Sequence, residues 1–233
     1  MNAWLGPTLE IDELGDQVET ARLSDYFFPK ATTAWALFAR ADGGRTFIHA
    51  QASSRGSKSE WAVRQFLVAP PAAAQVVLER ALDLTIFECD ESAFVERERY
   101  QASQGPNLHA QPIALPAILR RDDWCRPFPD RAARVTLSYA GQVRLRLAGA
   151  ALSVRAIRLT AEQEHERRIQ WMVEGVGEVA IGAEHGGFQR WLLGWSCQSG
   201  RVLFGGAGEF PEASSLPSLP ERAGPTRATK SIL

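Results

Sequence analysis

One stretch of the chain, residues 135–204, constrains the fold more than any other, because apolar and polar residues alternate along it. A period of two residues is typical of a β-strand with one buried and one solvated face. Glycine-containing turns divide the stretch into roughly five or six segments, each long enough for one strand. The clearest segment places arginines between aliphatic residues, in the order Val143, Arg144, Leu145, Arg146 and Leu147. The stretch therefore predicts an antiparallel sheet around which the rest of the domain packs.

The first half of the chain carries similar signals. Asp42-Gly43-Gly44 is a strong hairpin turn, because glycine adopts positive φ without strain. The polar run 53–59 predicts a loop. Residues 72–82 favour a strand because their neighbours are strands, although their alanine content leaves a helix as the alternative. Strands are expected at Thr33–Ala39, Arg45–Ala52, Glu60–Val68, Leu84–Cys89 and Phe94–Tyr100.

The chain divides into three parts by composition. Residues 1–24 are acidic, and their apolar members fall near helical spacing, which predicts a short helix lying on the sheet: Leu9, Ile11, Leu14, Val18 and Ala21. Residues 25–204 form the β domain, with possible halves 25–110 and 111–204. The fold class expected is mainly β, with a curved antiparallel sheet that could comprise two similar sheets.

Residues 205–233 differ from the domain before them. They include four prolines and are otherwise mostly small or polar. Such a segment buries too little apolar surface to offset the entropy lost on ordering. A disordered, proline-rich tail is expected, whose end at Leu233 could also be read by a partner through its carboxylate.

Charge and composition narrow the function classes. Hydrophobic residues make up 45% of the chain, as in globular proteins, and the net charge of −1 gives no nucleic-acid footprint. The charge is uneven, since residues 120–168 hold eleven arginines and six acidic residues, whereas residues 1–30 hold six acidic and two basic residues. The simplest explanation for the uneven charge is that both charged segments lie on solvated faces of the protein. The alternative is that the basic residues form a patch that binds an acidic partner.

Localisation follows from what the sequence lacks. Cys89, Cys125 and Cys197 form no C-x-x-C pair, and an odd number of distant cysteines favours reduced thiols. Neither a signal peptide nor an apolar run of the ~20 residues that cross a bilayer is apparent. The protein is expected in the cytoplasm, or in the periplasm if an export signal has been removed.

Several motifs are similar to those of a group of poorly characterised bacterial β domains, many of them lipoproteins or periplasmic proteins. Such domains begin with an aromatic–Phe–Pro motif followed by a tryptophan, which resembles Tyr26-Phe27-Phe28-Pro29 and Trp35 here. The segment from Leu115-Pro116 to Trp124 looks like a second copy of this motif. Trp171 before Gly175-Val176-Gly177, followed by Arg190-Trp191-Leu192-Leu193, resembles the end of these domains.

The resemblance covers roughly residues 25–200, is carried by few positions, and implies a half-barrel related to lipoprotein-carrier folds. It brings no catalytic residue. The chain departs from the pattern at Thr32 and Arg121, where the group has glycine, and at Glu174, where it often has proline. The secretion signal of the group is also missing. A cytoplasmic variant that kept the scaffold and lost the export role fits these departures.

Catalytic and metal-binding motifs are mostly missing, so neither an enzyme nor a cofactor is expected. Gly175-x-Gly177 lacks the third glycine of a dinucleotide site, and Ser196-Cys197 follows no nucleophile-elbow pattern. Glu164-His165-Glu166 and Glu184-His185 could share a metal if their turns met. Exposed turns favour these residues in any case, so no metal site is predicted. His49 and His109 are expected to be ordinary surface or half-buried residues.

The tryptophans and two arginines are the candidate binding residues. Trp191 and Trp195 are four residues apart on one strand and so are expected on one face, with Trp171 on a neighbouring strand. Their simplest role is to fill the core, and the alternative is to line an apolar cavity that holds a lipid-like ligand. Arg144 and Arg146 are expected to face away from the core, toward a protein or an anionic head group.

These features favour a non-catalytic protein-binding or assembly protein, in which the β domain is a platform and the terminal segments are docking arms. The alternative is a carrier of an apolar or lipid-like ligand in the half-barrel. A protein partner is expected, nucleic acid and a transmembrane segment are not, and a homo-oligomer is compatible with the sequence.

Overall fold

A computed structural model gives the structure of the chain. It describes residues 11–14, 20–28, 31–55, 58–68, 78–101, 105–107, 113–120, 124–125, 134–138, 142–147, 150–163, 166–183, 187–197 and 200–203. For some strand residues, Arg144 and Arg146 among them, the description covers the backbone alone. The predicted tail at 205–233 lies outside these ranges.

The described part is built of strands and one short helix, as the sequence predicts. In the first half, the elements are β1 (Ile11–Leu14), β2 (Thr20–Arg22), α1 (Leu23–Phe27), β3 (Thr33–Arg40), β4 (Arg45–Arg55), β5 (Lys58–Val68), β6 (Leu78–Cys89), β7 (Ala93–Gln101) and β8 (Gly105–Asn107). In the second half, they are β9 (Ile113–Pro116), β10 (Ile118–Arg120), β11 (Trp124–Cys125), β12 (Arg134–Ser138), β13 (Gln142–Leu147), β14 (Ala150–Gln163), β15 (Glu166–Val173), β16 (Gly177–Ala183), β17 (Gly187–Cys197) and β18 (Gly200–Leu203).

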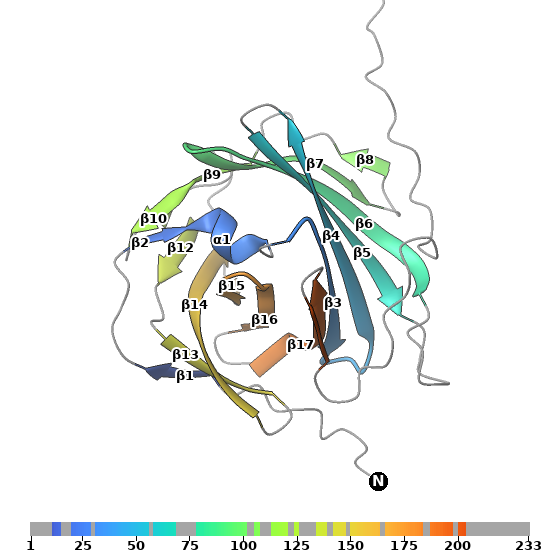
Figure 1. Cartoon of the computed structure of the whole chain (residues 1–233), viewed down its shortest axis with the longest axis vertical. Coiled ribbons are helices and arrows are strands. Elements are labelled where there is room, and N and C mark those ends of the chain that lie inside the picture. The colour runs from blue at the N-terminus through green and yellow to red at the C-terminus, as the bar shows by residue number, and fades with distance from the viewer. Residues whose placement is uncertain are drawn as a thin grey trace, which may run out of the picture.

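One strongly curved antiparallel sheet dominates the fold and forms a half-barrel. Its main path runs β1-β13-β14-β15-β16-β17-β3-β4-β5-β6-β7-β8, and β2 pairs with β10 in a separate two-stranded sheet. In Figure 1 the strands curl around α1, with β14 on one side and β4 to β7 on the other. The mainly β half-barrel with one short helix is therefore confirmed.

The two halves of the chain meet in the middle of the sheet. Strand β17 pairs with β3 in antiparallel register, from Arg190 opposite Arg40 to Cys197 opposite Ala34. Residues 150 or more positions apart in sequence thereby become neighbours. The halves 25–110 and 111–204 share one sheet and do not form a separate sheet each.

The predicted N-terminal helix is displaced along the chain. Residues 11–14 form β1 on β13, and 20–22 form β2 on β10. The helix follows at Leu23–Phe27, after residues 9–21, whose apolar spacing predicted a helix. These residues form strands in spite of their helical spacing, because each strand provides hydrogen-bond partners for backbone groups at the edge of β13 or β10.

The expected loop at 53–59 is also shorter than predicted. Strands β4 and β5 remain paired out to Arg55 opposite Lys58. Ser53, Ser54 and Ser59 are polar but lie within these paired strands, since a long hairpin satisfies its backbone groups whatever the side chains. In the ambiguous segment 72–82, residues from Leu78 onward belong to β6, and 72–77 lie outside the described residues.

An aromatic core fills the half-barrel near α1. Phe28 follows the helix, is 3% exposed, and stacks on Trp61 with ring centroids 4.5 Å apart and planes within 2°. Phe87 and Phe94 both lie 5.6 Å from the same ring. Side chains from α1, β5, β6 and β7 thus converge on Phe28, which closes this end of the half-barrel.

The expected alternation of wet and buried faces fails in the middle of the sheet. Leu37, Phe38 and Ala39 are consecutive in β3, and each is at most 1% exposed. Leu37 packs in a cluster with Phe47 and Phe66, whereas Phe38 packs in another with Leu192. Both faces of the sheet are buried at this point, so apolar residues occupy consecutive positions.

Candidate functional site

A pocket of about 360 Å³ lies at the end of the half-barrel opposite α1. The helix is held at the β15–β16 turn, where Gly175 N donates to Asp25 O at 2.7 Å. The pocket lies at the other ends of β15 and β16 and beside the β3–β4 turn. Nine residues line it: Arg40, Ala41, Asp42, Thr46, Gln65, Arg168, Ile181, Gln189 and Arg190.

One sharp turn and one tight strand contact position this lining. Gly43 has φ of 84° in the β3–β4 turn, where Gly44 N donates to Asp42 Oδ1 at 3.0 Å. At the edge of β16, a Cβ on Gly182 would lie 2.7 Å from the carbonyl oxygen of Gly187. No larger residue fits at Gly182 without a backbone shift, so glycine allows β17 to bring Arg190 close to Ile181.

Arg190 is held in place within the pocket wall. Its Nη2 donates to Glu178 Oε1, and the side chains are only 17% and 13% exposed. Gln170 Nε2 donates to the other oxygen, Glu178 Oε2. The Arg190 guanidinium also lies 5.0 Å from the centroid of the Phe38 ring. Glu178 and Phe38 together fix a partly neutralised cation.

Two buried polar atoms on the same wall have no hydrogen-bond partner. They are Arg190 Nε and Thr46 Oγ1, and Thr46 is only 1% exposed. Leaving a buried polar group unpaired costs about 1–3 kcal/mol. Unpaired groups of this kind are uncommon in folded proteins, and each calls for an explanation, such as a bound group that supplies the missing partner.

Further ionisable groups lie behind the pocket. Burial raises the pKa of Asp83, and this outweighs the lowering by Arg99 and Arg190, while Glu96 adds to the rise. Glu96 is 7% exposed and accepts a 2.9 Å hydrogen bond from Arg99 Nη2. The raised pKa reflects the cost of burying the Asp83 carboxylate near these charged groups.

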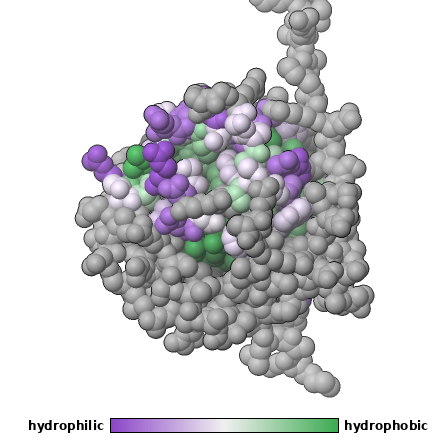
Figure 2. Space-filling model, viewed as in Figure 1, coloured by the Kyte–Doolittle hydropathy of each residue, from purple (hydrophilic) through white to green (hydrophobic). Residues whose placement is uncertain are grey.

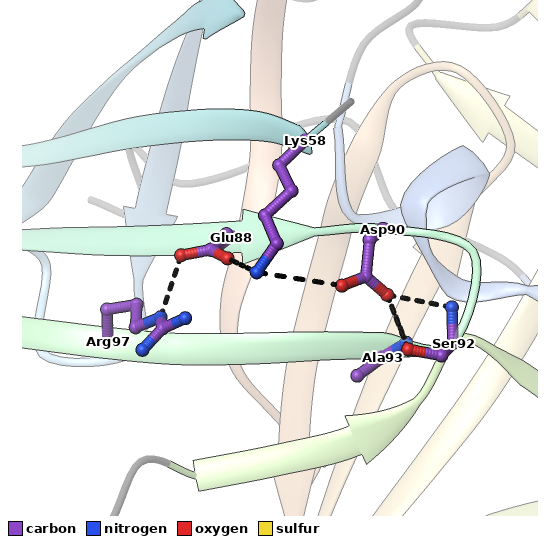
Figure 3. A network of polar contacts seen from close by, with 6 residues as sticks. All are labelled: Lys58, Glu88, Asp90, Ser92, Ala93 and Arg97. Carbon is purple, nitrogen blue, oxygen red and sulfur yellow. Dashed lines mark hydrogen bonds and ion pairs between the residues drawn. The ribbon is translucent and has the colours of Figure 1, made fainter. Parts of the chain in front are cut away.

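A second polar cluster lies at the β6–β7 hairpin and has a structural role (Figure 3). Glu88 pairs with Lys58 and, at 2.8 Å, with Arg97, and these hydrogen bonds lower its pKa. Asp90 accepts from Ser92 Oγ and N, both at 2.7 Å, and from Ala93 N at 2.9 Å, which lowers its pKa to about 2. Every charged group drawn has a partner, so the cluster secures the hairpin.

The tryptophans predicted as binding residues do not line the pocket. Trp171 lies 5.3 Å from Phe188 in an edge-to-face contact, and Trp171, Trp191 and Trp195 pack, partly buried, against a core cluster. Register places Trp171 and Trp191 on one face, each opposite Ala180. This arrangement serves core filling.

The prediction that Trp191 and Trp195 share a face is wrong. Trp191 pairs with Ala39 and Trp195 with Ala36, three residues apart on a regular strand. A β-bulge between Leu192 and Gly194 inserts one residue and reverses the alternation. Trp195 therefore lies on the opposite face, where its Nε1 is buried without a hydrogen-bond partner.

The remaining candidates are placed only in part. Arg144 and Arg146 lie on β13, opposite Ser153 and Ala151, and their side chains are outside the description. His165 and His185 are outside it as well. Among the residues that are described, no group of three or more metal-ligating side chains occurs. His49 is more buried than expected, at 3% exposed.

Sequence reasoning missed the pocket residues because six separate strands and a turn supply them. One signal was present, since Thr46, Gln65 and Arg190 are polar at strand positions that face the interior. Such residues need hydrogen-bond partners when they are buried.

The visible surface is mixed in polarity. Figure 2 shows hydrophilic and hydrophobic residues side by side on the described part of this face. Among the described residues, Ile118 is the one large hydrophobic side chain that is exposed. No helix in the described ranges has the length and hydropathy needed to span a membrane.

Comparison with family models, with curated proteins and with solved structures found no match to this chain.

Proposed function

We propose that this chain is a non-catalytic binding protein that holds a small polar ligand at the pocket end of its half-barrel. One observation carries the proposal: Thr46 Oγ1 and Arg190 Nε are buried on the pocket wall without partners. A ligand that supplied those partners would recover free energy that the empty protein lacks. The pocket volume of about 360 Å³ is at the small end of the range for ligand sites.

The chemistry of the pocket favours binding over reaction. Its nine lining residues offer positive charge, amides and a hydroxyl, without histidine or cysteine. The buried thiol of Cys89 is remote, in the aromatic core, and burial followed by the charges of Asp90 and Glu88 raises its pKa to about 12. His49 lies on the other face of β4 from Thr46, since the two are three residues apart on a regular strand.

Native mass spectrometry of the protein purified from its own host tests the proposal. We expect a bound small molecule in the wild type and its loss or depletion in Thr46→Val, which removes the unpaired hydroxyl at nearly constant volume. Thr160→Val is the matched control, because Thr160 is 2% exposed and does not line the pocket. A clean ligand-free mass in every preparation, with no compound that binds on screening, would refute the proposal.

Thermal unfolding of the same variants separates binding from structural roles. Because the Thr46 hydroxyl has no partner, Thr46→Val should be at least as stable as the wild type without ligand. The scaffold role predicted from the terminal segments stays a separate prediction. It is tested by comparing the partners that full-length protein and a chain cut at Gly205 capture.

A further inference from the structure

The pocket lining is strongly cationic for its size. Three arginines, Arg40, Arg168 and Arg190, face one acidic residue, Asp42. Arg40 and Asp42 pair with each other at the exposed rim, with side chains 38% and 56% exposed. Glu178 partly neutralises Arg190, so the positive charge that remains within the pocket comes mainly from Arg168, and it attracts an anionic group.

Arg168 differs from Arg190 in having no partner. It is exposed, and none of the described residues forms an ion pair or hydrogen bond with its side chain. The side chain belongs to the pocket face of β15, whereas the adjacent Arg167 must point to the opposite face of the strand. Arg167 pairs there with Glu162, its Nε lying 3.2 Å from Oε1. The two neighbouring arginines thus differ in two respects: Arg168 lines the pocket, whereas Arg167 is paired with Glu162 on the other face.

The donors come from several directions. Arg168 stands on β15, Arg190 on β17, Thr46 on β4 and the Gln65 amide on β5. A planar carboxylate offers two oxygens, whereas a phosphoryl group offers three oxygens in a pyramid and meets donors from several strands at once. Arginine binds phosphate through paired N–H donors, and Arg190 still has an unpaired N–H on Nε.

We propose that the ligand of this pocket carries a phosphoryl group, bound by Arg168, Arg190 and Thr46. This inference rests on the proposed function and adds the chemical class of the ligand. Arg190, fixed by Glu178, provides a preorganised donor, and Arg168 closes on the anion from the open side. The phosphoryl group can belong to a soluble phosphate ester or to a phospholipid head group.

Calorimetric titration of the full chain with pyrophosphate and glycerol 3-phosphate tests the soluble source, with glycerol as the neutral comparison. Flotation with phosphatidylcholine vesicles, with and without phosphatidic acid, tests the lipid source. Arg168→Gln should weaken binding about tenfold or more, as expected for losing one charge-assisted contact. Arg167→Gln, its neighbour with the same charge change, should alter binding less than about twofold.

Binding in either arm that is sensitive to Arg168→Gln and not to Arg167→Gln supports the inference and identifies the source. Equal effects of the two variants, equal binding of glycerol, or no phosphate binding in either arm overturns it. The native mass spectra then separate the two proposals. A copurified ligand without phosphorus that Thr46→Val removes would leave the binding function standing, whereas no ligand at all would overturn both.

Discussion

Replacing His49 with phenylalanine should remove a large part of the acid sensitivity of this fold. His49 is 3% exposed, its ring stacks on Trp35 at a centroid distance of 4.0 Å, and its Nε2 is buried without a partner. Arg64 Nη1 lies 3.5 Å from its Nδ1. Burial first, and then the charge of Arg64, lower the pKa of His49 from 6.5 to about 4.

The sign and size follow from proton linkage. Between these two pKa values the unfolded chain binds a proton at His49 and the folded chain does not, so acid favours unfolding. Stability is unaffected well above the unfolded pKa of 6.5 and declines as the pH falls toward about 4. From pH 7 to pH 5 the loss at this one residue is about 2 kcal/mol.

Urea unfolding of the wild type and His49→Phe at a series of pH values measures this loss. Phenylalanine keeps a ring to stack on Trp35 and does not titrate. Carboxylates and the other histidines titrate in both proteins, so they cancel in the difference between the two stabilities. That difference should shift in favour of the variant by about 2 kcal/mol as the pH falls from 7 to 5. A difference that stays constant across this range would refute the reasoning.

Two further changes test the packing and the β6–β7 hairpin. Phe28→Ala should lower the free energy of unfolding, measured by chemical denaturation, by about 3–5 kcal/mol, because it leaves a cavity in the aromatic core where Phe28 stacks on Trp61. A loss below about 1 kcal/mol would contradict this packing. Asp90→Asn should lower the melting temperature at neutral pH, because the carboxylate accepts hydrogen bonds from Ser92 and Ala93. The pKa of Asp90 is lowered from its ordinary value of 3.8 to about 2 in the folded protein. The difference in melting temperature between the wild type and the variant should therefore shrink as the pH falls from 3.8 toward 2. A difference that does not change with pH would contradict the role of these hydrogen bonds.

Local chemistry made the turns predictable. Asp42-Gly43-Gly44 and Gly175-Val176-Gly177 were identified because glycine accepts positive φ, and both turns contain such residues, with φ of 84° at Gly43 and 72° at Gly175. Strand positions followed from alternation, which needs only neighbouring residues. The mainly β fold was therefore within reach of the sequence pattern, whereas the half-barrel was implied by the resemblance.

Features that depend on distant partners were not predictable in the same way. The bulge at Leu192–Gly194 reverses the alternation through one inserted residue, and the sequence on either side reads as regular strand. Residues 11–14 are helix-compatible by spacing but pair with β13. The pocket needs Thr46, Gln65 and Arg190 to meet across three strands, and only the sheet order brings them together.

Pairing of β17 with β3 also has a consequence for how the protein is made. On the ribosome, β3 emerges early, yet its neighbour on that side is synthesised only near the end of the domain. Until then one edge of β3 presents unpaired backbone groups and apolar side chains, which invite association with other nascent chains. Translation that stops before residue 187 should thus leave a fragment prone to aggregate, and chaperones that cover exposed strands should matter most during this interval.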